Sequence, residues 1–139
     1  MNLSGLDHVV LRCRDLENMK DFYTALGCRL VKHNTAVGIW HYSCGGSTLI
    51  DLIAVDGPLG EKKGAPPALD SAHNVDHICI KVDPWVEADI VAHLTSIGVK
   101  AQESVTRFGA DGNGPSIYIE DPEGNGLELK GRVWPIDEA

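Results

Sequence analysis

Polar and apolar residues alternate along two short segments, 6–12 and 75–81, that carry nearly the same sequence. The first is L-D-H-V-V-L-R and the second is V-D-H-I-C-I-K, so a histidine stands at the same place in both. Alternation with a period of two is typical of a half-buried β-strand. The chain is therefore predicted to contain an internal repeat, each copy of which begins with a strand.

In each copy the spacing of apolar residues then changes to that of a helix. Helical spacing begins after Asp15, a favoured N-cap residue, and ends at Gly27. In the second copy it begins after Asp83 and Pro84 and ends at Gly98. Further β-prone segments follow at about 28–33, 37–43 and 47–55, and then at 99–102, 115–119 and 126–130. The pattern predicts an α+β fold built from two βαβββ modules.

The length of 139 residues fits a single domain, 1–139, in which two half-size modules share a core. Module 1 is expected at about 5–55 and module 2 at about 75–131, followed by a short C-terminal tail. The segment 56–74, rich in proline and glycine, is expected to be a linker. Because a half-open sheet would expose strand edges, we expect two modules to face each other, within one chain or across a homodimer.

The alternation assigns each strand residue to one of two faces. One face is apolar in both copies: Val9, Leu11, Ile50, Leu52, Ile78, Ile80, Leu127 and Leu129. The other mixes titratable and small residues, as a ligand pocket does: His8, His41, Asp51, His77, Cys79, Ser116, Tyr118 and Glu128. The first face is predicted to be the core and the second the functional site.

Two histidines and two carboxylates hold repeated positions on the polar face: His8 with His77, and Asp51 with Glu128. Charged groups in the middle of strands are costly unless something satisfies them, and a divalent ion would do so. Imidazole and carboxylate suit Fe, Mn, Ni, Co or Zn, and the absence of cysteine from the set argues against a structural thiolate zinc site. The alternative is that duplication alone kept both motifs, with His8 and His77 hydrogen-bonded to Asp51 and Glu128.

Two further residues on this face have candidate roles. His41 is a candidate general base beside the metal, although a structural role stays open. Cys79 is expected to line the pocket as a small packing residue rather than to act as a nucleophile.

Composition excludes several partners. The formal net charge of −8 argues against a nucleic-acid or anionic-membrane surface. No apolar run approaches the roughly 20 residues that a membrane-spanning helix needs. The four cysteines form no C-x-x-C pair and no disulfide framework, which indicates a reducing, cytoplasmic setting.

Four motifs together resemble the vicinal oxygen chelate superfamily, which includes glyoxalase I, extradiol dioxygenases, and fosfomycin and bleomycin resistance proteins. They are L-D-H-V-V-L, D-F-Y-T-A-L-G, V-D-H-I-C-I and S-I-Y-I-E-D-P-E-G-N-G-L-E-L. The resemblance spans about 5–131 and implies that His8, His77 and Glu128 bind one divalent ion. Glyoxalase I has a fourth ligand, usually Glu, where this chain has the shorter Asp51, which implies either a ligand or a base.

The segment 107–118 is similar to the glycine-rich loop and S-x-Y strand that fosfomycin-resistance relatives place around the substrate phosphonate. The resemblance implies substrate-binding roles for Ser116, Tyr118 and Arg107, with Cys79 beside them. An ordinary surface hairpin loop is the alternative for this segment.

The resemblance favours a metal-dependent, glyoxalase-like lyase or isomerase acting on a small substrate with adjacent oxygens. In that reaction Glu128 or Asp51 would move a proton while the ion stabilises the enolate or oxyanion. The alternatives are a thiol transferase or epoxide hydrolase like the fosfomycin-resistance enzymes, an extradiol-type dioxygenase, and a metal-free binding module like the bleomycin resistance proteins. Glyoxalase-like relatives of this length commonly pair modules between chains, which supports the homodimer.

Overall fold

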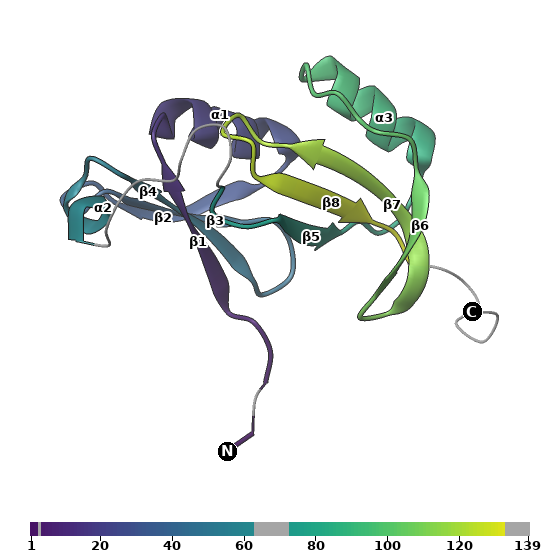
Figure 1. The fold of residues 1–139 in the computed structure, drawn as a ribbon, viewed down its shortest axis with the longest axis horizontal. Coiled ribbons are helices and arrows are strands. Elements are labelled where there is room, and N and C mark those ends of the chain that lie inside the picture. The colour runs from purple at the N-terminus through teal and green to yellow at the C-terminus, as the bar shows by residue number, and fades with distance from the viewer. Residues whose placement is uncertain (3, 63–72, 133–139) are drawn as a thin grey trace. The chain divides into compact units, whose positions relative to one another are not determined.

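The computed structural model describes residues 1–2, 4–62 and 73–132 and divides the chain into unit 1, Met1–Asn74, and unit 2, Val75–Ala139 (Figure 1). The elements of unit 1 are β1 (His8–Cys13), α1 (Leu16–Leu26), β2 (Arg29–Asn34), β3 (Ile39–Ser43), β4 (Leu49–Ala54) and α2 (Pro58–Lys62). Those of unit 2 are β5 (His77–Lys81), α3 (Glu87–Ser96), β6 (Val105–Gly109), β7 (Gly112–Glu120) and β8 (Gly126–Lys130). Each unit is thus a βαβββ module, and the predicted α+β fold of two such modules is confirmed.

Both sheets are mixed and have the same topology. The strand order is β1-β4-β3-β2 in unit 1 and β5-β8-β7-β6 in unit 2. The first strand of each unit pairs in parallel with the last, and the other neighbours are antiparallel. The parallel pair therefore brings the two repeated sequence motifs of each unit side by side, with β1 or β5 as the edge strand of its sheet.

The predicted apolar face supplies much of the core of each sheet, although Val9, Ile78 and Ile80 on that face are only half-buried. The buried side chains of unit 1 include Leu11, Met19, Tyr23, Ile50 and Leu52, and those of unit 2 include Leu94, Ile117, Ile119, Leu127 and Leu129. Helix α1 begins and ends as its sequence predicts, because the Asp15 carboxylate accepts a hydrogen bond from the Asn18 amide at 3.0 Å and Gly27 adopts a φ of 122°. The caps and the alternation together direct the apolar residues of unit 1 inward.

Two elements of unit 2 differ from their prediction. Helix α3 begins at Glu87, with Val86 at the N-cap position, rather than directly after Asp83. Acidic residues in its first turn, among them Glu87, favour this later start because they interact well with the helix dipole.

The expected strand at 99–102 is absent, and the second strand of unit 2 is instead β6, which starts at Val105 and overlaps the beginning of the segment 107–118 that was expected to be a glycine-rich loop. Glycine occurs there because of close packing. A Cβ on Gly109 would lie 2.7 Å from Cε of Lys130, and one on Gly114 would lie 2.2 Å from the carbonyl oxygen of Gly131. The segment is therefore a β-hairpin that packs tightly against β8.

Part of the predicted linker is ordered against unit 1. Helix α2 lies within it, and its Gly60 carbonyl accepts a hydrogen bond from the Arg12 guanidinium at 3.1 Å. At the other end of the linker the Asn74 side chain bonds to both the backbone amide and the carbonyl of Arg12. The linker residues 63–72 lie outside the described part of the chain.

A disulfide joins Cys28, at the end of the α1 turn, to Cys44, which follows β3. The sequence spacing had favoured four reduced cysteines. The pairing follows from strand register, since Arg29 lies opposite Ser43 and the next residues outward, Cys28 and Cys44, have Cα atoms 4.3 Å apart. None of the helices among the described residues is long and apolar enough to cross a membrane.

Candidate functional site

The polar face of unit 2 brings five of the predicted site residues together. In the register of the sheet Glu128 stands between Cys79 on β5 and Tyr118 on β7. Nε2 of His77 lies 3.3 Å from Oε2 of Glu128. His77 has Gly126 directly opposite it on β8, so the β8 side chain that reaches the imidazole is that of Glu128, two residues further along the strand.

The Glu128 carboxylate is held by a neighbour on β7. It is 5% exposed, and its Oε1 accepts a hydrogen bond of 2.5 Å from the fully buried Ser116 hydroxyl. Ser116, expected to contact substrate, thus orients Glu128 in this structure. A buried carboxylate with one oxygen hydrogen-bonded and the other directed at an imidazole is suited to binding a cation.

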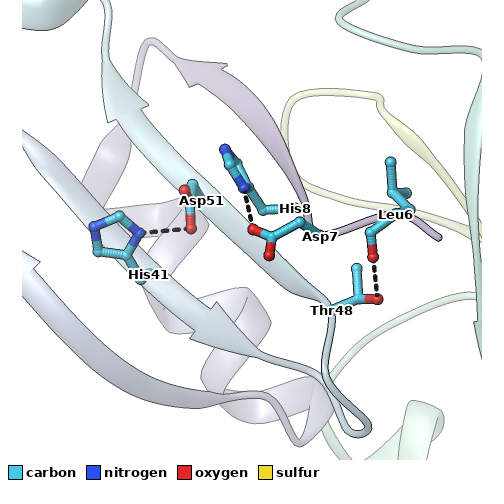
Figure 2. Close-up of polar contacts among 6 residues, drawn as sticks. All are labelled: Leu6, Asp7, His8, His41, Thr48 and Asp51. Carbon is cyan, nitrogen blue, oxygen red and sulfur yellow. Dashed lines mark hydrogen bonds and ion pairs between the residues drawn. The ribbon is translucent and has the colours of Figure 1, made fainter. Parts of the chain in front are cut away.

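Each repeated histidine has an unexpected partner, the aspartate directly before it in the chain. Nδ1 of His8 lies 2.6 Å from Oδ1 of Asp7, and Nδ1 of His77 lies 2.6 Å from Oδ2 of Asp76 (Figure 2 shows the first pair). An ionised carboxylate only accepts hydrogen bonds, so Nδ1 donates in both pairs, and in the neutral imidazole Nε2 then carries the lone pair. Carboxylate partners of this kind orient metal-binding histidines in proteins.

Sequence reasoning missed both aspartates because it assigned them by alternation. Asp7 and Asp76 precede the first residue of β1 and β5, where the alternation of faces no longer constrains the side chain. The sequence did contain a sign of this contact, because an aspartate directly precedes the histidine in both copies of the repeat. This pairing also limits the alternative in which His8 bonds to Asp51, because the Nδ1 of His8 already has Asp7 as its partner.

In unit 1 the carboxylate of Asp51 hydrogen-bonds to His41 and not to His8, which was its partner in the alternative to metal binding. Asp51 is 3% exposed and lies opposite His41 in the register of β3 and β4. Its Oδ1 accepts a 2.7 Å hydrogen bond from Nδ1 of His41, as Figure 2 shows. The pKa of His8 is raised from its ordinary value, first by the hydrogen bond to Asp7 and next by the charge of Asp51. Asp51 thus acts on His8 through its charge, while its hydrogen bond orients His41.

Tyr118 connects His77 with the β6–β7 hairpin. The rings of His77 and Tyr118 meet edge to face with centroids 5.8 Å apart, and the Arg107 guanidinium carbon lies 5.8 Å from the centroid of Tyr118. Tyr118 and Arg107, which the sequence predicts to bind substrate, therefore lie next to His77, a candidate metal ligand of unit 2.

A pocket of about 390 Å³ opens on this face and is lined by residues of unit 2 alone. His77, Cys79 and Glu128 line it together with the basic residues Lys81, Lys130 and Arg132 and with the hairpin residues 108–112. A volume of this order accommodates a small molecule.

Cys79 lies in the pocket as an exposed thiol. Loss of solvation and the negative charge of Glu128 raise the pKa of Cys79 to about 11, so the thiol is protonated near neutral pH. This supports its expected role as a lining residue rather than a nucleophile.

Each unit supplies two candidate ligands, His8 with Asp51 and His77 with Glu128. Within 1–2, 4–62 and 73–132, no three His, Cys, Asp or Glu side chains gather closely enough to hold an ion. The donor set nevertheless fits a divalent ion, because both histidines have Nδ1 fixed and Nε2 available and Glu128 is buried beside one of them.

A family model described as "Glyoxalase/Bleomycin resistance protein/Dioxygenase superfamily" matches residues 5–129. The chain is 32% identical over 130 residues to the glyoxalase domain-containing protein RDO1 of Mycosarcoma maydis, covering 93% of this chain and 69% of that protein.

Solved structures match over nearly the whole chain. An integron cassette protein from V. cholerae has a TM-score of 0.75 at 29% identity, with 96% of this chain and 98% of that chain covered. A virulence protein from Salmonella typhimurium has a TM-score of 0.78 at 26% identity, with 96% and 100% covered. The fosfomycin resistance protein FosX of Mesorhizobium loti, at 18% identity, 99% and 100% coverage and a TM-score of 0.67, shares the fold.

Proposed function

The chain belongs to the Glyoxalase/Bleomycin resistance protein/Dioxygenase superfamily, and we propose that it is a metal-dependent, glyoxalase-like lyase or isomerase. Its substrate is a small molecule with two adjacent oxygens. The observation that carries the proposal is the pair of Asp–His hydrogen bonds at 2.6 Å, which leaves Nε2 available on both repeated histidines.

His8 of unit 1 and His77 and Glu128 of unit 2 are the proposed ligands of one divalent ion, which is Fe, Mn, Ni, Co or Zn. Imidazole nitrogen and carboxylate oxygen are ligands that these ions share. When bound with open positions, the ion binds the adjacent substrate oxygens and stabilises the negative charge that develops on them.

The proton-transfer group is His41, oriented by Asp51. Because Nδ1 of His41 donates to the Asp51 carboxylate, Nε2 has a free lone pair and accepts a proton from substrate. Asp51 thereby acts as a positioning residue for His41. This role fits the hydrogen bond between the two side chains better than direct binding of Asp51 to the ion does. In unit 2, Ser116 fixes Glu128, and Tyr118 packs against His77, so both ligands are held before any ion binds.

The second candidate function is addition of a thiol or water to an epoxide. The observation that favours it is the Arg107–Tyr118 pair beside His77, a place where a phosphonate or similar group can be bound. A panel containing a dicarbonyl with thiol, a catechol and an epoxide separates the two functions and the dioxygenase alternative.

Ion binding is tested first by chelation. Protein purified without added metal is analysed for bound ions, then stripped, and each of the five ions is added back. An ion at about 1,000 times its dissociation constant adds roughly 4 kcal/mol to the free energy of unfolding, so the melting temperature falls on chelation and recovers on addition.

His8→Ala, His77→Ala and Glu128→Ala should each lose this recovery, and His33→Ala, at an exposed position of β2, should keep it. If no ion is found beforehand and chelation leaves the melt unchanged, the protein is a metal-free binding module.

The active unit is proposed to be a homodimer, with a mass of roughly 30 kDa, twice the 15.0 kDa chain. Mixing a His8→Ala chain with a Glu128→Ala chain tests whether sites form between chains, because some heterodimers then regain one intact site. A site formed within each chain stays broken in both. A monomer with full metal content would contradict the homodimer.

A further inference from the structure

Basic residues gather in the unit 2 pocket beside the candidate metal ligands. Lys81 on β5 lies directly opposite Lys130 on β8, and both line the pocket with Arg132. Like charges directly opposite each other on one face of a sheet are unfavourable. A negative group close to both side chains would stabilise this arrangement.

Lys130 is the least solvated of these cations. It is 7% exposed. Its ammonium donates a hydrogen bond of 2.5 Å to the carbonyl oxygen of Arg107. An ammonium has three donors, and its charge is costly to bury without a negative partner.

The β6–β7 hairpin is shaped around this lysine. A Cβ on Gly109 would come within 2.7 Å of Cε of Lys130, and a Cβ on Gly114 would come within 2.9 Å of its Nζ. The two glycines make room for the lysine side chain, so its position is built into the packing of the strands.

Asp111, at the turn between β6 and β7, is the carboxylate that now balances these charges. Its Oδ2 lies 2.6 Å from Nζ of Lys81. The pKa of Asp111 is lowered first by this hydrogen bond and also by the charges of Arg132 and Lys130, so all three cations act on it.

The other carboxylates of the pocket are Asp83 and Glu128, and Glu128 is engaged by Ser116 and faces His77. The Asp111 carboxylate pairs with Lys81 of the subsite, and at 41% side-chain exposure it can exchange with a solute.

We propose that Lys81, Lys130 and Arg132 form a subsite for an anionic group of the substrate, and that the Asp111 carboxylate occupies this subsite when no ligand is bound. The group is a carboxylate or a phosphoryl group. As a statement about substrate this rests on the proposed function, because His77 and Glu128 line the same pocket. The substrate class is then a small acid with its anionic group at one end and its adjacent oxygens at the other.

The subsite is tested on metal-free protein, so its outcome is independent of whether an ion binds. Inorganic phosphate and acetate are titrated separately at constant ionic strength, and amide NMR shifts of residues 108–112 give a dissociation constant for each. Phosphate alone, acetate alone or both can shift these amides, which identifies the type of group bound.

Lys130→Gln is expected to weaken binding of the preferred anion at least tenfold, while Lys100→Gln, at an exposed position of the same unit, leaves it unchanged. The exposed Lys81 gives a second variant, Lys81→Gln, that should also weaken binding without disturbing packing, as an unchanged melting temperature would verify. Asp111→Asn is expected to tighten binding several-fold because it removes the competing carboxylate.

The proposal is overturned if neither anion shifts these amides, or if both lysine variants bind like the original protein. It is also overturned if Asp111→Asn binds no more tightly than the original protein. If no bound ion is found and chelation leaves the melt unchanged, while anion binding is retained, the proposed function fails and the subsite stands.

Discussion

Replacing Asp76 by Asn tests whether the aspartate before each repeated histidine prepares it for metal. In the original protein Nδ1 of His77 donates to the Asp76 carboxylate at 2.6 Å, which fixes both the tautomer and the direction of the ring. An Asn amide can donate or accept, so it no longer requires the proton to be on Nδ1. The His77 imidazole is then free to bring a protonated Nε2 towards the ion.

The expected loss follows from the exposure of the pair. Removing such a partner typically costs about 10- to 100-fold in metal affinity. The Asp76 side chain is 98% exposed, so solvent screens the interaction and we expect the lower end, about tenfold. Asp7→Asn should give a similar loss at His8, since the Asp7 side chain is 90% exposed.

The assay is calorimetric titration of stripped protein with the ion identified by metal analysis. Asp89→Asn, an exposed aspartate in α3 of the same unit, is the matched control and should bind like the original protein. Retention of full affinity in Asp76→Asn would refute the reasoning and show that other contacts set the His77 tautomer.

Three further predictions concern the packing and reactivity of the chain. Reduction of the Cys28–Cys44 disulfide, which spans 16 residues, should lower the free energy of unfolding by about 3 kcal/mol in a thermal or urea melt, and equal melts with and without reductant would contradict this. The Cys79 thiol, with its pKa raised to about 11, should be alkylated by iodoacetamide about 100-fold more slowly at pH 8 than an ordinary exposed cysteine, and an ordinary rate would show that its pKa is not raised. Gly60→Ala should cost about 1–3 kcal/mol in a urea melt, because its Cβ would lie 2.0 Å from the Ala54 carbonyl oxygen, and an unchanged midpoint would mean that α2 packs differently.

The sequence was most informative where a pattern was repeated. The D-H motifs located β1 and β5, and the alternation after them separated the apolar face from the polar face. Capping residues placed α1 correctly, because Asp15 and Gly27 act locally on the backbone. Periodicity and caps depend on neighbours in the chain, and a single sequence contains that information.

Contacts that depend on register could not be predicted in this way. The Cys28–Cys44 pair forms because β2 and β3 align residues far apart in the chain, and their spacing carries no sign of it. In the same way nothing in the sequence indicated that the Ser116 hydroxyl donates to Glu128 on the adjacent strand. Side-chain partners across a sheet follow from register, which the pattern of one strand does not give.

Glycine has two possible roles in the segment 107–114, and the sequence alone left a loop that closes over a ligand and an ordinary hairpin loop both open. Four glycine and asparagine positions indicated a loop, whereas Gly109 and Gly114 lie in strands where Lys130 and Gly131 approach the backbone. The residue that explains these glycines is on β8. A glycine that serves close packing is recognised only once its neighbour is known.

The two repeated carboxylates differ in length and in the residue opposite them on the antiparallel strand, which is His41 for Asp51 and Tyr118 for Glu128. Glu128 reaches His77, the histidine on the strand parallel to its own, whereas the shorter Asp51 hydrogen-bonds to His41 on the antiparallel neighbour. Asp51→Glu should therefore move the carboxylate towards His8 and away from His41, which tightens ion binding and lowers turnover by about 10²- to 10⁴-fold as His41 loses its orientation. Asp51→Asn, which keeps the side-chain length, should lower turnover without tightening ion binding. Both quantities can be measured on the same preparations, and an Asp51→Glu protein with full turnover would show that His41 is not the proton-transfer group.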